Sequence, residues 1–171
     1  MSNDGPQHDP NVSAQGLRIA VVVSRYNAEI TDSLLAGAQG AFESMGGEAE
    51  NLTVIRVPGS FELPALAGVC ARSGQFDGVV TLGCLIRGKT IHDRVIADAV
   101  AGALASISAT TGIPVGFGLL TTDTFEQAKA RAGGADGNEG GNKGNDAMRA
   151  CVETHHAIGS IKPTGGFGFN S

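Results

Sequence analysis

The sequence contains no tryptophan, a single tyrosine and no cluster of lysine or arginine residues, and its formal net charge is −5. Proteins that bind nucleic acid neutralise its phosphate groups with a basic surface. No such surface can be built from this composition. The sequence therefore argues against nucleic acid as a partner.

Long hydrophobic runs are also missing. The longest apolar runs, such as residues 19–23, are far too short to cross a bilayer, which takes about 20 residues of helix. The first 16 residues have no basic patch followed by an apolar stretch, so we expect no secretory signal, no membrane partner and a cytoplasmic protein. Their Pro, Asp, Asn and Gly content predicts a mobile arm over residues 1–16, before a domain over 17–160 and a tail over 161–171.

Cysteine is scarce and scattered. Cys70, Cys84 and Cys151 are odd in number and lack the spacing of a metal site. Reduced, buried thiols in the cytoplasm account for them. We expect neither a metal ion nor a disulfide framework.

Blocks of strand length and helix length alternate along the chain. An apolar run rich in β-branched residues predicts a strand at residues 17–24, and a second such run predicts a buried strand at 78–86. Residues 51–57 and 114–121 are predicted to form two further strands. Apolar residues at spacings of three and four, together with cap signals, predict helices between and after them, over 34–45, from 60 onward, over 93–111, 123–132 and 142–158. Ser60 is expected to cap the second helix, and residues 123–126 resemble a capping box. The alternation indicates one α/β domain with a parallel sheet between two helical layers.

Polar residues follow the end of each predicted strand, at positions 25–27, 60–62, 87–92 and 122–123. The carboxyl ends of parallel strands lie on one rim of the sheet, and open α/β folds bind their ligands there. We therefore expect these four segments to form one site.

One of these segments overlaps a nucleotide-binding pattern. Residues 83–90, GCLIRGKT, match the phosphate loop G-x-x-x-x-G-K-[ST]. However, residues 84–86 extend an apolar strand instead of wrapping around phosphates, and the match follows the third strand rather than the first. The acid that would hold magnesium, Asp123, doubles as a helix cap. The pattern therefore argues against a nucleotide hydrolase.

A weaker interpretation of this segment survives. Gly88, Lys89 and Thr90 lie between a strand end and a helix start, where free N–H groups and the helix dipole favour an anion. His92 follows within reach, and an imidazole suits general acid–base work near neutral pH. From its position alone, His92 is equally well explained as a polar residue at a helix start.

Five blocks in order carry a resemblance to a known family: SRYN at 24–27, VPGSFELP at 57–64, TLGCLIRGKTIH at 81–92, PVGFGLLTTDTFEQAKARAG at 114–133 and GNKG at 141–144. Over roughly residues 17–160 the chain resembles the lumazine synthases (6,7-dimethyl-8-ribityllumazine synthases) of riboflavin biosynthesis. The resemblance implies a flavodoxin-like three-layer α/β/α sandwich with a four-stranded parallel sheet. It also implies homopentamers with each active site between neighbouring subunits, and riboflavin synthase as a possible partner.

The implied reaction condenses 5-amino-6-ribitylaminouracil with 3,4-dihydroxy-2-butanone 4-phosphate. A Schiff base forms, phosphate leaves, the ring closes and water is lost, with no metal or organic cofactor. By this resemblance His92 is the catalytic residue that transfers protons. The pyrimidine and its ribityl chain are implied to contact Tyr26, Asn27, Ser60, Phe61, Glu62, Leu85, Ile86 and, from the neighbouring subunit, Phe117. The phosphate is implied to contact Gly88, Lys89, Thr90 and, from the neighbouring subunit, Arg131, with Lys143 as a further candidate.

Three of these roles have alternatives. Tyr26 stands where the family has an aromatic stacked on the pyrimidine; the alternative, a core aromatic, is disfavoured by its neighbours Arg25 and Asn27. Glu62 stands where the family has an acid that accepts hydrogen bonds from ribityl hydroxyls. An acid such as Glu62 is also favoured in a first helical turn by the helix dipole. Arg131 on its own would be a solvated charge, so its role rests on the resemblance.

The sequence departs from the family's pattern in three places. After the histidine the family commonly has an aromatic, an acidic and a second aromatic residue, whereas this chain has Asp93, Arg94 and Val95; we expect one of the two charges to tune proton transfer by His92. Lys89 replaces a residue that is commonly small or acidic. Residues 134–141 form a longer turn than in shell-forming members, which predicts isolated pentamers rather than sixty-subunit shells.

Three other functions stay open beside the enzyme. A riboflavin synthase of the related archaeal type would use two lumazine molecules and no phosphorylated partner, which the segment 88–90 and Arg131 disfavour. A non-catalytic flavin- or lumazine-binding or scaffold paralogue is compatible with the altered residues after His92. The nucleotide hydrolase is the most distant alternative.

Overall fold

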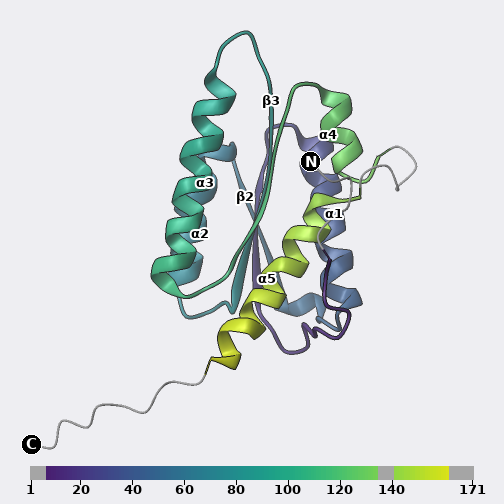
Figure 1. The fold of residues 1–171 in the computed structure, drawn as a ribbon, viewed down its shortest axis with the longest axis vertical. Helices are drawn as coiled ribbons and strands as arrows, with labels where there is room; N and C mark the ends of the chain where they lie inside the picture. Colours follow the sequence, from purple (N-terminus) through teal and green to yellow (C-terminus); the bar gives the residue numbers. More distant parts are fainter. Residues whose placement is uncertain (1–6, 135–140, 162–171) are drawn as a thin grey trace, which may run out of the picture.

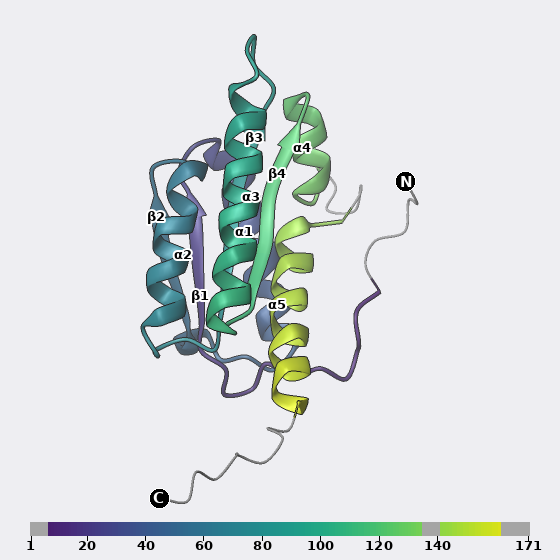
Figure 2. The same cartoon turned by 60° about the vertical axis from the view of Figure 1, so that its left-hand side comes forward.

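The computed structural model describes residues 7–134 and 141–161 (Figure 1). Its centre is a parallel sheet of four strands: β1 (Ile19–Ser24), β2 (Leu52–Val57), β3 (Gly78–Ile86) and β4 (Val115–Thr122). The strands lie in the order β2-β1-β3-β4, so that β2 and β4 form the two edges (Figure 2). The predicted parallel sheet of four strands is confirmed, and β3 has the predicted bounds.

Helices cover both faces of this sheet (Figure 1). One face carries α1 (Ala28–Ser44), α4 (Phe125–Arg131) and α5 (Lys143–Ser160), and the other carries α2 (Leu63–Arg72) and α3 (His92–Thr111). Two short 3₁₀ turns, η1 (Ala49–Asn51) and η2 (Ser60–Glu62), precede β2 and α2. Each layer of helices encloses its own apolar core against β1 and β3. The predicted flavodoxin-like three-layer α/β/α sandwich is confirmed.

The topology creates a crevice at the carboxyl edge of the sheet. β1 and β3 are neighbours, with Ile19 opposite Gly78, yet the connections that follow them lead to α1 on one face and α3 on the other. Chain segments that diverge to opposite faces leave a gap outside the strand ends, which is where open α/β sheets bind ligands. This is the rim on which the polar segments were expected to meet.

The start of α2 differs from the prediction that Ser60 caps it. Ser60 lies inside η2, and α2 begins only at Leu63. The residue ahead of the turn is Gly59, whose backbone N–H donates to Oε2 of Glu62 over 2.8 Å. A 3₁₀ turn ahead of the helix thus moves Ser60 away from the cap position, and its hydroxyl accepts no hydrogen bond from the helix start.

The cap of α4 is shifted by one residue from the predicted box at 123–126. The extended residue is Thr124, and its Oγ1 accepts a hydrogen bond from the backbone N–H of Gln127 over 3.2 Å. Gln127 Oε1 in turn accepts from the N–H of Asp123 over 2.9 Å. Both threonine and aspartate suit a cap, so the sequence alone does not separate the two registers.

Part of the predicted N-terminal arm contacts the body of the protein. His8 Nδ1 lies 2.8 Å from Glu153 Oε1 on α5, and His156 Nε2 lies 2.6 Å from the carbonyl oxygen of Ser13. Ala14 is fully buried. Residues 1–6 of the arm and 162–171 of the tail lie outside the described residues, and the mobility of the arm stays a prediction.

At the amino ends of the strands, an ion pair joins the residue before β1, Arg18, to the residue before β3, Asp77. Asp77 Oδ2 accepts a hydrogen bond from the backbone N–H of Arg18 over 2.8 Å, and Oδ1 lies 3.3 Å from Nη2 of the same arginine. His155 Nδ1 on α5 lies 3.2 Å from the carbonyl oxygen of Asp77. Partial burial opposes ionisation of Asp77, but the hydrogen bonds from Arg18 outweigh it, and the pKa of the carboxyl lies below its ordinary value.

Candidate active site

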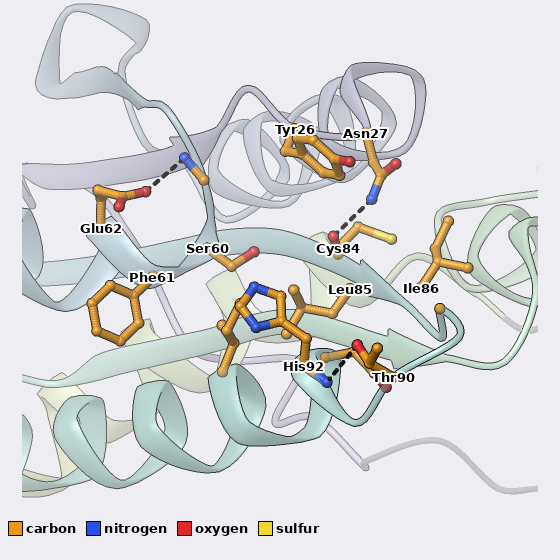
Figure 3. Close-up of a pocket in the computed structure, with 14 residues that line it drawn as sticks. Tyr26, Asn27, Ser60, Phe61, Glu62, Cys84, Leu85, Ile86, Thr90 and His92 are labelled. Carbon is orange, nitrogen blue, oxygen red and sulfur yellow. Dashed lines mark hydrogen bonds between the residues drawn. The ribbon is translucent and has the colours of Figure 1, made fainter.

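A cavity of about 580 Å³ opens at the carboxyl edge of β1 and β3. Its walls are the loop after β1, the turn η2, the end of β3 and the first turns of α3 (Figure 3). It brings together most of the residues predicted from the sequence: Tyr26, Asn27, Ser60, Phe61, Glu62, Leu85, Ile86, Gly88, Thr90 and His92. Four segments that are far apart in the sequence therefore line one continuous cavity.

The floor of the cavity depends on a glycine. Gly83 lies in the middle of β3, and a Cβ there would lie 2.8 Å from Ser60 Oγ and 2.8 Å from Leu119 Cδ1. Real Cβ atoms essentially never approach so closely. Ser60 is only 5% exposed, and its Oγ has no hydrogen-bond partner among the described residues. The absence of a side chain at Gly83 lets this hydroxyl sit at the base of the cavity.

Asn27 ties the ends of the two central strands together. Its backbone is left-handed, with φ of 57°, a conformation that asparagine tolerates better than most residues. Its Nδ2 donates to the carbonyl oxygen of Cys84 in β3 over 2.9 Å (Figure 3). The side chain that was expected to face a ligand therefore also fixes the mouth of the cavity between β1 and β3.

Two aromatic rings stand at the mouth of the cavity. Tyr26 is 70% exposed and Phe61 is 64% exposed. Figure 3 shows them on different walls, with Tyr26 beside Asn27 and Phe61 on η2. Aromatic surfaces this open are available for stacking on a planar ligand or for contact with a partner subunit.

One of the two carboxylate oxygens of Glu62 is engaged in a hydrogen bond within the protein. Its Oε2 accepts the hydrogen bond from Gly59, so this oxygen holds the turn η2 in shape. The side chain is partly exposed and lines the cavity. The prediction offered two roles for Glu62, a turn acid and a ligand contact; the structure supplies the first and leaves room for the second.

The loop before α3 carries His92 into the cavity. Figure 3 shows its imidazole directed from the start of α3 toward the turn that carries Ser60. The backbone N–H of His92 lies 3.4 Å from Thr90 Oγ1. Gly88 and Thr90 line the cavity, whereas Lys89 is exposed and does not. Residues 83–86 are part of β3, so the GCLIRGKT segment does not wrap as a phosphate loop does, as the sequence predicted.

Besides Lys89, three predicted site residues do not line this cavity. Phe117 is 51% exposed on the edge strand β4, and together with Lys143 it lines a separate hollow of about 370 Å³ between β4 and α5. Lys143 Nζ lies 2.7 Å from Asp146 Oδ2. Arg131 is exposed at the end of α4, where its Nη1 donates to the carbonyl oxygen of Gln127 over 3.2 Å. Phe117 and Arg131 were expected to serve a neighbouring subunit, and that expectation stays a prediction.

Four cavity residues were not among the predicted ligand contacts: Gly59, Cys84, Asp93 and Ile96. Asp93 and Ile96 are three positions apart on α3 and therefore share one face of the helix, a signal that the sequence does contain. The two charged residues after His92 differ in their surroundings: Asp93 is buried in the cavity wall, whereas Arg94 is exposed and does not line the cavity. Burial raises the pKa of the Cys84 thiol to about 11, so at neutral pH it is protonated and not a nucleophile.

The described residues carry neither a membrane span nor a metal cluster. Among the helices of residues 7–134 and 141–161, none combines the length and the apolar character needed to cross a membrane. Within the same ranges, no three His, Cys, Asp or Glu side chains come together as a metal site would require.

Residues 16–158 match the family model described as 6,7-dimethyl-8-ribityllumazine synthase. The chain belongs to this family. Curated family members with this name include a protein of Kineococcus radiotolerans, 45% identical over 163 residues that cover 95% of this chain and 98% of the relative. Another is from Nitratidesulfovibrio vulgaris strain Miyazaki F, 45% identical over 141 residues, or 82% of this chain and 88% of the relative. The family match spans every strand and helix of the sandwich except the last residues of α5, and it contains the whole cavity.

Proposed function

We propose that the chain catalyses the formation of 6,7-dimethyl-8-ribityllumazine from 5-amino-6-ribitylaminouracil and 3,4-dihydroxy-2-butanone 4-phosphate. The observation that carries this proposal is the single cavity that contains the family's characteristic segments, in a chain that matches the family over residues 16–158. Phosphate and water are the other products.

The walls of the cavity suit the two substrates. The half-buried side chains of Leu85 and Ile86 and the open ring of Tyr26 offer apolar surface for a planar pyrimidine. Ser60 and Glu62 offer a free hydroxyl and a carboxylate for the ribityl hydroxyls. These groups would hold the amine of the pyrimidine in place for attack on the carbonyl of the second substrate, and alignment of this kind contributes a large part of the barrier reduction in two-substrate reactions.

The start of α3 suits the phosphate. Gly88 and Thr90 lie beside the first turn of a helix of 20 residues, where unpaired N–H groups and the helix dipole favour an anion. The positive charge of Lys89, which is exposed beside them, would attract the bound phosphate. In this arrangement the departing phosphate remains held while the chain of the butanone rearranges.

His92 lies between the two subsites and is the group we assign to proton transfer. Schiff-base formation, loss of phosphate and ring closure each move a proton, and an imidazole exchanges protons readily near neutral pH. Its ring points into the cavity and is exposed to the ligand space (Figure 3). No other side chain that lines the cavity is an imidazole.

In this proposal a second copy of the chain contributes the remaining residues of the site. Phe117 and Arg131 do not line the cavity of their own chain, and the rings at its mouth are open. A ring of five copies would bring Phe117 of one subunit over the pyrimidine of the next and Arg131 to its phosphate. We expect such a homopentamer in the cytoplasm, with riboflavin synthase as the consumer of the product.

The assembly prediction rests on the turn at 134–141. Residues 135–140 lie outside the described residues, so the prediction is made from the length of the turn alone. Light scattering should give the mass of a pentamer; a particle in the megadalton range would contradict it.

A mixing experiment tests the activity. Both substrates are combined with the protein, and the absorbance and fluorescence of the lumazine product are followed against the uncatalysed rate. A rate no higher than the uncatalysed one, with ligand still bound, would favour a binding paralogue. Conversion of the lumazine itself to riboflavin, with no phosphorylated substrate, would favour the archaeal-type riboflavin synthase.

A further inference from the structure

The strongest unassigned feature of the cavity is a carboxylate in its α3 wall. Asp93 is 9% exposed, and its Oδ1 is buried with no hydrogen-bond partner among the described residues. Burying a carboxylate oxygen away from water without a donor is costly, so such groups are normally paired. Asp93 also lines the cavity, so a ligand bound there could supply the donor that the described part of the chain does not provide.

The charges around Asp93 restrict what that ligand group can be. No lysine or arginine lines the cavity, and the neighbouring Arg94 is exposed on the outside of α3. Across the cavity, the turn η2 packs against α3 and presents Ser60 and Glu62. An anionic group placed between two carboxylates would be repelled. The group that fits carries hydrogen-bond donors and no negative charge.

Asp93 lies in the first turn of α3, directly after His92 and next to the proposed phosphate subsite. With Ile96 it shares the helix face turned toward the cavity, whereas Gly88 and Thr90 precede the first residue of the helix. Glu62 has one oxygen occupied by the Gly59 N–H, which leaves the opposite wall short of acceptors. A chain of hydroxyls lying between η2 and α3 would use both walls.

We propose that Asp93 is a specificity-determining residue that accepts hydrogen bonds from the hydroxyl groups of the ligand's polyol chain, opposite Glu62. This inference rests on the proposed function, which supplies a ligand with a ribityl chain. A site with a buried acceptor for a hydroxyl rejects analogues that lack it, because the acceptor is then left unpaired. Asp93 thus selects ribityl-bearing ligands over those that share only the ring system.

The test compares two ligands on two variants. Fluorescence titration measures the Kd of 6,7-dimethyl-8-ribityllumazine and of 6,7,8-trimethyllumazine, which has a methyl group in place of the ribityl chain. In Asp93→Asn we expect the Kd of the ribityl ligand to rise about tenfold, while that of the methyl ligand changes by less than about twofold. Asp98→Asn, an exposed acid on the same helix, is the matched control and should leave both values unchanged.

Several outcomes would overturn the proposal. Equal weakening of both ligands in Asp93→Asn would mean that the residue shapes the cavity generally, and no weakening of either would remove it from binding. If kcat falls while the KM of the pyrimidine substrate holds, Asp93 acts on His92 instead. Should Asp93→Asn fail to fold by circular dichroism, Asp93→Ala takes its place with the same expected ratio.

The same experiment separates this inference from the activity. A wild-type protein that prefers the ribityl ligand but forms no product retains the role of Asp93 and loses the proposed function. A wild-type protein that forms product but binds both ligands equally retains the function and loses the role of Asp93.

Discussion

Replacement of Gly83 by alanine tests the packing of the cavity floor most directly. The new Cβ would lie 2.8 Å from Leu119 Cδ1 and from Ser60 Oγ, with Leu63 Cδ1 at 3.1 Å, whereas ordinary contacts of this kind begin at 3.4 Å. Two side chains must therefore move by roughly 0.6 Å in a packed interior. Because one of them is Ser60, the change reaches the ligand space.

The magnitude follows from two opposing effects. Overpacking a buried site costs about 1–3 kcal/mol. Alanine in place of glycine recovers about 0.5–1 kcal/mol of backbone entropy in a strand. The difference between these ranges is about 0–2.5 kcal/mol, so we expect Gly83→Ala to lose about 1 kcal/mol of unfolding free energy, which lowers Tm by about 2–4 °C for each kcal/mol in a chain of this size. The KM of the pyrimidine substrate should rise as well, because the Ser60 hydroxyl is displaced.

Urea unfolding at a fixed protomer concentration measures the change in stability, since an oligomer's stability depends on concentration. Gly40→Ala is the matched control: Gly40 is exposed in α1, and a Cβ there meets no atom within 4 Å. This variant should gain up to about 1 kcal/mol, as alanine does in an exposed helix interior. If Gly83→Ala matched the wild type in both stability and KM, the tight contact between β3 and the Ser60 turn would be refuted.

Three further predictions follow from groups described above. His92→Gln should lower kcat by about 10²-fold or more with a small change in KM, measured by lumazine formation; an unaltered kcat would remove the imidazole from proton transfer. The depressed pKa of Asp77 stabilises the fold above its ordinary pKa, and this stabilisation is lost as the pH falls through the lower, folded value, so Asp77→Asn should flatten the loss of stability below about pH 4 in urea titrations; parallel curves would contradict the role of the Arg18 pair. Burial raises the pKa of Cys84 to about 11 and that of Cys151 to about 12, so iodoacetamide at pH 8 should label these thiols only after unfolding, as mass spectrometry would show.

The sheet could be predicted from the sequence because its central strands are unambiguous. β1 is buried at every position, and β3 at all but its last two, which forces a continuous apolar, β-branched run of strand length. The edge strand β2 has only one buried residue, yet its flanking turns still marked its ends. Helix starts were less predictable: Ser60 and Asp123 are as good at capping as the groups that do the capping, and only the local backbone decides between them.

The candidate site was predictable where a residue follows directly from a strand end. The carboxyl ends of parallel strands meet on one rim whatever the details of packing, so the positions of Asn27, Ser60 and His92 could be foreseen. The orientation of Asp93 could not, because an acid in the first turn of a helix is accounted for by the helix dipole alone. Which cavity Phe117 serves depends on how copies assemble, and one sequence contains no direct record of that.

The carboxyl ends and the amino ends of the strands have separate roles: the first carry the cavity, and the second carry contacts that stabilise the fold. Every residue that lines the cavity lies near the carboxyl edge, whereas the Arg18–Asp77 pair and the His155 contact lie at the amino edge, a full strand length away. Substitutions separated by such a distance, with no shared partners, usually have additive effects. An engineer could therefore strengthen the amino edge, by a new ion pair or a shorter connection, and raise the working temperature of the protein without retuning its chemistry.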